Sequence, residues 1–165
     1  MTQPNEEAAA DWLILAGGLV LFASLFLTWS HQFSASFLGR FGHSTVLQGV
    51  PRNPTAWQVY STSDVVLALL AGALAGVAVL GSHRARLLAC SGAVLALIFV
   101  VHAMSAPPTN GALIYNPAAG HYAANSPAAG PGETVAVIGL LLALTGLALS
   151  LLADRASPAR APATA

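Results

Sequence analysis

The chain contains 165 residues, of which 56% are hydrophobic and only 7% are charged, and its formal net charge is zero. Soluble domains carry roughly 25% charged residues, so this composition argues against a water-soluble domain. The six Lys and Arg residues are all Arg and are scattered, which excludes a basic patch for nucleic acid. The single Cys90 excludes an internal disulfide and a CxxC metal site.

Four apolar segments are each long enough to cross a hydrocarbon core of about 30 Å as a helix. The backbone polar groups of such segments need internal partners in lipid, so helices are expected. The sequence predicts an all-α fold, a four-transmembrane-helix bundle with antiparallel neighbours and two outer loops. The predicted parts are one membrane domain over residues 1–153, with spans at 12–30, 65–81, 87–104 and 134–153, and a disordered tail at 154–165.

The first span has a Trp near each end, Trp12 and Trp29, set roughly 25 Å apart along a helix. Indole rings favour the two membrane interfaces, so both residues are predicted interface anchors. The residues before this span include Glu6, Glu7 and Asp11 and no basic side chain, unlike a cleavable signal peptide. We therefore expect the segment to be retained.

The Arg residues favour one orientation in a bacterial plasma membrane. Basic residues concentrate in short cytoplasmic loops. The side with both termini and the 82–86 turn carries Arg84, Arg86, Arg155 and Arg160, whereas the other side carries Arg40 and Arg52. Both termini are therefore predicted to be cytoplasmic.

The first outer loop contains Phe33, Phe37 and Phe41 at a spacing of four, which places three rings along one face of a helix. Two interpretations remain open: an interfacial helix lying on the membrane, or a loop whose rings pack on the rim of the bundle. Trp57 and Tyr60 form a second aromatic pair and are predicted interface anchors on a helix that extends the second span outward.

The second outer loop, residues 105–132, is rich in Pro, Gly, Ala and Asn and contains Pro-Ala-Ala-Gly twice, at 117–120 and 127–130. Such a composition predicts turns and no separate domain. Its Tyr115 and Tyr122 suggest a segment that covers the outer mouth of the bundle or contacts a partner.

Small residues at helical spacing predict the packing faces of the spans. Helix association in lipid depends on close backbone approach at such residues. The predicted packing residues are Ala68, Gly72 and Gly76 in the second span, Gly92 and Ala96 in the third, and Gly139 and Ala143 in the fourth. These stripes predict a tightly packed bundle, with a homodimer through the glycine face as the alternative.

No ionisable residue lies near the middle of a span, which weakens a transporter interpretation, and no residue is predicted to be catalytic. The ionisable residues gather instead at the predicted outer helix ends, as His31, Asp64, His102 and Glu133. Together they could bind a divalent metal, and His31 with His102 could ligate a haem. The alternative treats each separately, since Asp64 and Glu133 are favoured at helix N-termini by the macrodipole.

Two strings, GGLVLFASLFLTWS and AWQVYSTSDVVLALLAGALA, carry a family resemblance. The first half of the chain resembles a group of small four-helix integral membrane proteins from high-GC Gram-positive bacteria. Members of that group often have Leu-Pro-Trp-Tyr where this chain has Leu27, Thr28, Trp29 and Ser30. The resemblance implies a membrane architecture and supplies no activity, cofactor or site residue.

The pattern as a whole favours a non-enzymatic integral membrane protein that acts as an accessory or interaction subunit. A small channel or carrier is the first alternative, and a membrane haem or metal protein is the second. The expected partners are the lipid bilayer and other membrane proteins or a second copy, with no nucleic acid and no cofactor.

Overall fold

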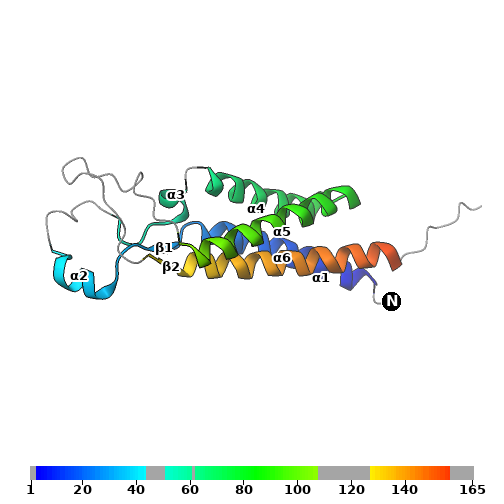
Figure 1. The fold of residues 1–165 in the computed structure, drawn as a ribbon. Helices are drawn as coiled ribbons and strands as arrows, with labels where there is room; N and C mark the ends of the chain where they lie inside the picture. Colours follow the sequence, from blue (N-terminus) through cyan, green and yellow to red (C-terminus); the bar gives the residue numbers. More distant parts are fainter. Residues whose placement is uncertain (1–2, 44–50, 61, 108–126, 157–165) are drawn as a thin grey trace, which may run out of the picture.

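The computed structural model describes residues 3–43, 51–60, 62–107 and 127–156 (Figure 1). Four long helices lie side by side, and each is long and apolar enough to cross a membrane. They are α1 (Gln3–Ser24), α4 (Ser63–Leu80), α5 (His83–Ser105) and α6 (Pro131–Ala156). The predicted all-α four-helix bundle is therefore confirmed.

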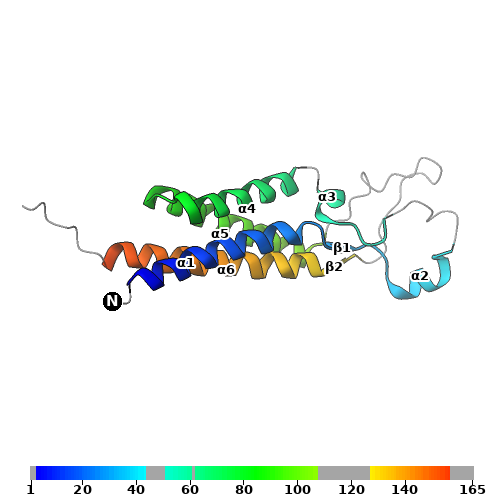
Figure 2. The same cartoon turned by 180° about the vertical axis from the view of Figure 1, so that it is seen from behind.

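The shorter elements lie together at one end of the bundle (Figure 1, Figure 2). They are β1 (Ser30–His31), α2 (Ala35–Phe41), α3 (Ala56–Val59) and β2 (Ala128–Ala129). We call this end the loop end. The opposite end, where α1 begins, α6 ends and α4 joins α5, is the terminal end. Both ends of the helical domain thus lie on one side, as an even number of crossings requires.

The closest helix contact joins α1 and α6 through glycines. A Cβ atom on Gly17 would lie 2.5 Å from the Ala143 nitrogen. One on Gly139 would lie 2.7 Å from the Leu21 nitrogen. The two backbones therefore touch directly, which is how helices associate in lipid without a hydrophobic drive between them. The predicted packing residues Gly139 and Ala143 lie in this contact.

The other contacts arrange the helices around this central pair. α4 packs on α1, where a Cβ on Gly18 would lie 3.0 Å from the Ala71 carbonyl oxygen, and α5 packs on α6. α4 and α5 touch each other far less, although they are consecutive. Buried side chains from all four helices form one core, which includes Ile14, Leu21, Leu74, Ala93, Val100, Leu140 and Leu147.

The glycine stripe of α4 does not take part in this packing. Gly72 and Gly76 are exposed, and a Cβ on either would meet no atom within 4 Å. α4 instead turns Leu67, Ala71 and Leu74 toward the core, at the i, i+4, i+7 spacing of one helix face. A stripe displaced by one residue is rotated by about 100°, so the packing expected at Gly72 and Gly76 is not made within the described chain.

The remaining predicted packing residues do lie against neighbouring helices. Ala68 is half-buried beside the core and Ala96 is buried within it. A Cβ on Gly92 would lie 3.2 Å from Leu70 Cδ1, so Gly92 marks a point where α5 approaches α4.

α1 begins and ends earlier than the expected span at 12–30. Its last turn tightens after Ser24, because the amides of Leu25 and Phe26 bond carbonyls three residues back. The chain then turns so that the Trp29 ring is fully buried, whereas Trp12 is 69% exposed. Trp29 is therefore not a lipid-facing anchor, and that prediction is corrected.

The other helices extend beyond the expected limits at polar residues. α5 begins at His83, where the Ser82 hydroxyl accepts a hydrogen bond from the Ala85 amide. α6 continues to Ala156, past the expected end at 153, and Asp154 in its last turns is paired with side chains of α5. Residues 157–165 of the expected tail lie outside the described residues.

The Phe33, Phe37 and Phe41 rings stack in series, with centroids 5.6 Å and then 5.1 Å apart. Phe37 and Phe41 belong to the short helix α2, which stands at the far tip of the loop end (Figure 1, Figure 2). Phe37 and Phe41 thus lie with α2 away from the rim of the four long helices, whereas Phe33 is buried.

The aromatic segment before the second span folds differently from expectation. α3 is separate from α4, because the backbone at Tyr60 is extended (φ −112°, ψ 136°). The predicted outward extension of the second span is therefore not made. Tyr115, Tyr122 and the first Pro-Ala-Ala-Gly lie outside the described residues, whereas part of the second forms β2.

Candidate functional site

Three aromatic rings from different parts of the chain meet at the loop end. The Tyr60 ring contacts Trp29 edge-on, with centroids 5.8 Å apart, and Phe99 at 5.5 Å. Tyr60 follows α3, Trp29 follows α1 and Phe99 belongs to α5. This aromatic cluster (Trp29, Tyr60 and Phe99) therefore closes the loop end of the bundle from three directions.

Glu133 lies in the first turn of α6 close to this cluster and is fully buried. Among the described residues, neither carboxylate oxygen has a hydrogen-bond partner. The Gly130 amide is close to the carboxylate, but it donates to the Trp29 carbonyl at 2.9 Å. A buried polar group without a partner is rare in proteins and costly, so Glu133 is an unusual side chain among those described.

The pKa of Tyr60 is affected by the nearby carboxylate of Glu133. Burial raises the pKa of the Tyr60 hydroxyl to about 12, and the negative charge of Glu133 acts in the same direction. An uncharged phenol and a buried carboxylate thus face one region at the loop end.

The local backbone explains why Glu133 lies there. β1 and β2 pair antiparallel, with Ser30 opposite Ala129, which brings the start of α6 to the end of α1. The Gly132 amide then donates to the Thr28 carbonyl at 2.7 Å. A Cβ on Gly132 would lie 2.5 Å from Trp29 Cδ1, so the close approach requires glycine.

Asp64, the other predicted acidic site residue, has a helical role. It is buried in the first turn of α4, where its Oδ1 accepts a hydrogen bond from the Val65 amide at 2.8 Å. A carboxylate at this position stabilises the positive end of the helix dipole. Asp64 therefore needs no ligand to explain it.

The predicted metal residues are not assembled into a site. His31 Nδ1 lies 2.8 Å from Asn53 Oδ1, and His102 is exposed on α5. Within the part of the chain that the structure describes, no group of three or more His, Cys, Asp or Glu side chains could hold a metal ion. His43 is exposed, and His121 lies outside that part.

The predicted interface anchors also separate. Trp57 is exposed near the start of α3, with its ring 5.9 Å from that of Phe26. Trp12 is exposed near the terminal end. These two rings are exposed, and their role as interface anchors stays a prediction, whereas Tyr60 and Trp29 belong to the aromatic cluster.

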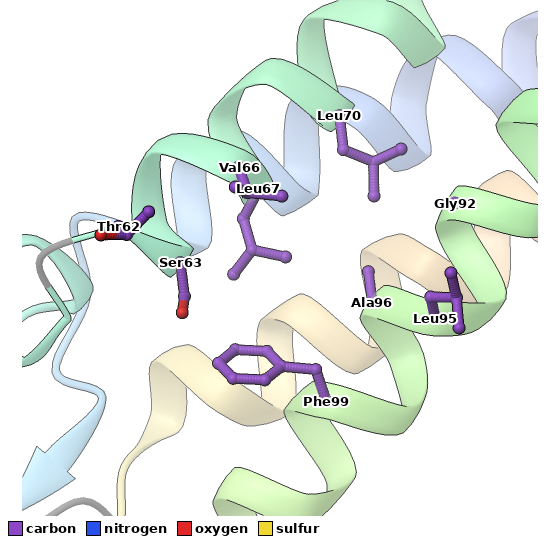
Figure 3. A pocket seen from close by; sticks show the side chains of 9 residues that line it. All are labelled: Thr62, Ser63, Val66, Leu67, Leu70, Gly92, Leu95, Ala96 and Phe99. Atoms are coloured by element: carbon purple, nitrogen blue, oxygen red, sulfur yellow. The ribbon is translucent and has the colours of Figure 1, made fainter.

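A groove of about 340 Å³ lies between α4 and α5 (Figure 3). Leu67 and Leu70 of α4 and Phe99 of α5 point into the space between the two helices. Thr62 and Ser63 stand at its loop end and supply its hydroxyl groups. This groove is a ligand-sized hollow among the described residues.

The terminal end is held by charged side chains. Arg86 of α5 lies 3.2 Å from Asp11 of α1 and 3.8 Å from Asp154 of α6. His83 also lies 3.0 Å from Asp154. These contacts link three helices at the end opposite the aromatic cluster.

Comparison with protein-family models, curated proteins and solved structures found no match to this chain. A function is therefore inferred from the arrangement of its own residues.

Sequence reasoning missed the groove and the Arg86 contacts. Asp11, Arg86 and Asp154 all lie next to predicted spans on the same predicted side of the membrane. That placement could have predicted that Arg86 pairs with the two aspartates. The groove had no comparable signal, because a short turn between two spans predicts that they pack closely together.

Proposed function

We propose that this protein is a non-enzymatic accessory or interaction subunit that binds another membrane protein, or a second copy, through the exposed face of α4. The observation that supports this proposal is the exposure of Gly72 and Gly76 on a helix that crosses the membrane. In the helix interior, each glycine costs roughly 0.5–1 kcal/mol relative to alanine. Within the described chain, these two glycines have no contact that explains that cost.

The other glycines of the long helices provide the comparison. A Cβ atom on any of them would lie 3.2 Å or less from an atom of another element. They are Gly17, Gly18, Gly92, Gly132, Gly139 and Gly146. Glycine in this bundle thus accompanies close approach of a neighbouring segment. At Gly72 and Gly76 the approaching segment is proposed to come from another polypeptide, as in GxxxG-type association.

We further propose a bacterial plasma membrane, with both termini in the cytoplasm. The terminal end carries the exposed Arg84 and Arg155, which agrees with the enrichment of basic residues on the cytoplasmic side. The likeness of the first half to small four-helix proteins of high-GC Gram-positive bacteria supports the same location. Thiol labelling of Arg84→Cys in intact cells would contradict this orientation if residue 84 were reached from outside.

Cysteine cross-linking in native membranes tests the proposed contact. In a Cys90→Ala background, Gly72→Cys and Gly76→Cys should each give the same adduct with a short thiol-reactive photo-cross-linker. The control Leu88→Cys is exposed on α5 and should not give it. Adding Gly76→Leu should strongly reduce the adduct formed from Gly72→Cys.

The mass of the adduct separates the two kinds of partner. Twice the mass of the chain identifies a second copy, and any other single mass identifies a different protein. Adducts without a common mass, or equal adducts from position 88, would contradict an interface on α4.

A small channel or carrier is the second candidate, and the buried Glu133 favours it. Ionisable residues enclosed in membrane proteins commonly mark ion pathways. Vesicles containing the purified protein should then conduct protons or monovalent cations, and Glu133→Gln should abolish that flux. Equal leakage from protein-free and protein-containing vesicles would remove this candidate.

A further inference from the structure

The groove between α4 and α5 opens in one direction. The two helices are joined by Gly81 and Ser82, and they diverge toward the loop end in both views (Figure 1, Figure 2). Gly92 and Leu70 approach each other at the deep end of the groove. Thr62 and Ser63 stand at the other end, where α4 begins.

The chemistry of the walls changes along this direction. Leu67, Leu70 and Ala96 form apolar walls in the membrane-spanning part, and Phe99 lies nearer the loop end (Figure 3). The hydroxyls lie at the start of the candidate span Ser63–Leu80, where a membrane interface is expected. The Thr62 side chain makes no capping hydrogen bond to α4, so its hydroxyl is available to a ligand.

The length of the groove corresponds to one leaflet. The eight residue steps from Thr62 to Leu70 span about 12 Å along a helix. Half of a typical hydrocarbon core is about 15 Å. A molecule in the groove would therefore extend from the interface toward the middle of the bilayer.

The volume of about 340 Å³ suits a thin occupant. A helix is about 10 Å across with its side chains, so it could place only one face in the groove. A single hydrocarbon chain is thinner and can lie along the whole groove. Apolar walls with a few polar groups at one end are typical of small-molecule sites between the helices of a bundle.

We propose that the α4–α5 groove binds one acyl chain of a membrane glycerolipid, with the Thr62 and Ser63 hydroxyls donating hydrogen bonds to an ester carbonyl of the lipid. The apolar walls hold the chain, and the hydroxyls set its depth at the interface. This site is independent of the proposed partner contact at Gly72 and Gly76, because those residues do not line the groove.

Native mass spectrometry of the full chain released from mild detergent tests this site, with a phosphatidylglycerol of defined chains as the added probe. The wild-type protein should retain one lipid per chain. Val66→Trp adds a ring at an exposed position on the edge of the groove and should weaken retention roughly tenfold, the effect of about 1.4 kcal/mol. The matched control is Leu69→Trp, which is also exposed on α4 but does not line the groove, and it should retain the lipid.

Removing the hydroxyls tests the polar end of the site. Thr62→Val with Ser63→Ala should lower retention severalfold while the helix content stays unchanged. Equal retention by Val66→Trp and Leu69→Trp, or no lipid on the wild-type chain, would overturn the proposal. A dimer that replaces the lipid and is lost in Val66→Trp would also overturn it, because the occupant would then be a second copy.

Discussion

The indole Nε1 of Trp29 donates a hydrogen bond to the Ser24 carbonyl at 2.8 Å, and both residues are fully buried. Ser24 is the last residue of α1, and its carbonyl also accepts a hydrogen bond from the Leu27 amide at 3.1 Å. The Ser24 hydroxyl in turn donates to the Leu21 carbonyl at 2.6 Å. The Trp29 side chain therefore bonds the last residue of α1 and packs in the core of the bundle.

Replacing Trp29 with Phe should destabilise the protein by about 1–3 kcal/mol, because the buried Ser24 carbonyl keeps only the Leu27 amide as a donor and the ring becomes smaller. Thermal unfolding in a mild detergent measures this effect. Trp12→Phe is the control, since Trp12 is 69% exposed, and it should change stability little. Equal effects of the two substitutions would show that Trp29 does not close the core.

Gly17→Ala and Gly76→Ala should have opposite effects on the isolated chain. The new Cβ at Gly17 would lie 2.5 Å from backbone atoms of α6, so the helices must separate and the loss should reach about 3 kcal/mol or more. At Gly76 there is open space, and alanine should stabilise α4 by up to about 1 kcal/mol. Unfolding of monomeric protein in detergent compares them, and tolerance of alanine at Gly17 would contradict the α1–α6 contact.

Arg86→Gln should destabilise the terminal end by about 1–2 kcal/mol. The Arg86 side chain is 16% exposed and faces Asp11 and Asp154, so its loss leaves Asp11 without a cation and Asp154 with His83 alone. The magnitude lies between those of exposed and fully buried pairs. Arg84→Gln is the exposed control and should be nearly neutral. Hydrogen exchange should increase at the terminal ends of α1 and α6 in the Arg86 variant alone.

Tyr60 should make the stability fall at alkaline pH. Its pKa of about 12 in the folded protein exceeds its ordinary value of 10.0. Above pH 10 the unfolded chain releases this proton first, so the contribution is complete below pH 10 and is lost as the pH rises toward 12. The chain has no Lys, which removes the usual competing titration in this range.

Tyr60→Phe should flatten that alkaline decline, because it keeps the ring contacts and removes the hydroxyl. The decline is measured as the unfolding temperature between pH 9 and pH 12. An identical decline in Tyr60→Phe would contradict the assignment.

The four spans could be predicted from sequence because apolar length alone decides which segments cross a bilayer. The partner of each helix could not be predicted in the same way. Small-residue spacing occurs in α4 at Gly72 and Gly76 and in α6 at Gly139 and Ala143, but only the second pair packs inside the chain. The difference depends on which face of each helix meets α1, and this is a property of the assembled bundle.

The candidate site shows the same division. Glu133 could be expected at the start of a helix from the macrodipole alone. Its burial could not be expected, because it depends on the close approach of Trp29 to Gly132. Trp29 precedes Glu133 by more than 100 residues in the chain. The expected metal group is not assembled among the described residues, where His31 lies against Asn53 and His102 is exposed.

The contact between α1 and α6 has a consequence for biosynthesis. α6 is the last of the four long helices to leave the ribosome, so α1 waits in the membrane with Gly17 uncovered until translation of this domain is nearly complete. The α4–α5 hairpin lies between α1 and α6 in the sequence, so it enters the bilayer before α6 is available to pack on α1. A product truncated before α6 would therefore present the Gly17 face of α1 to lipid without its partner helix.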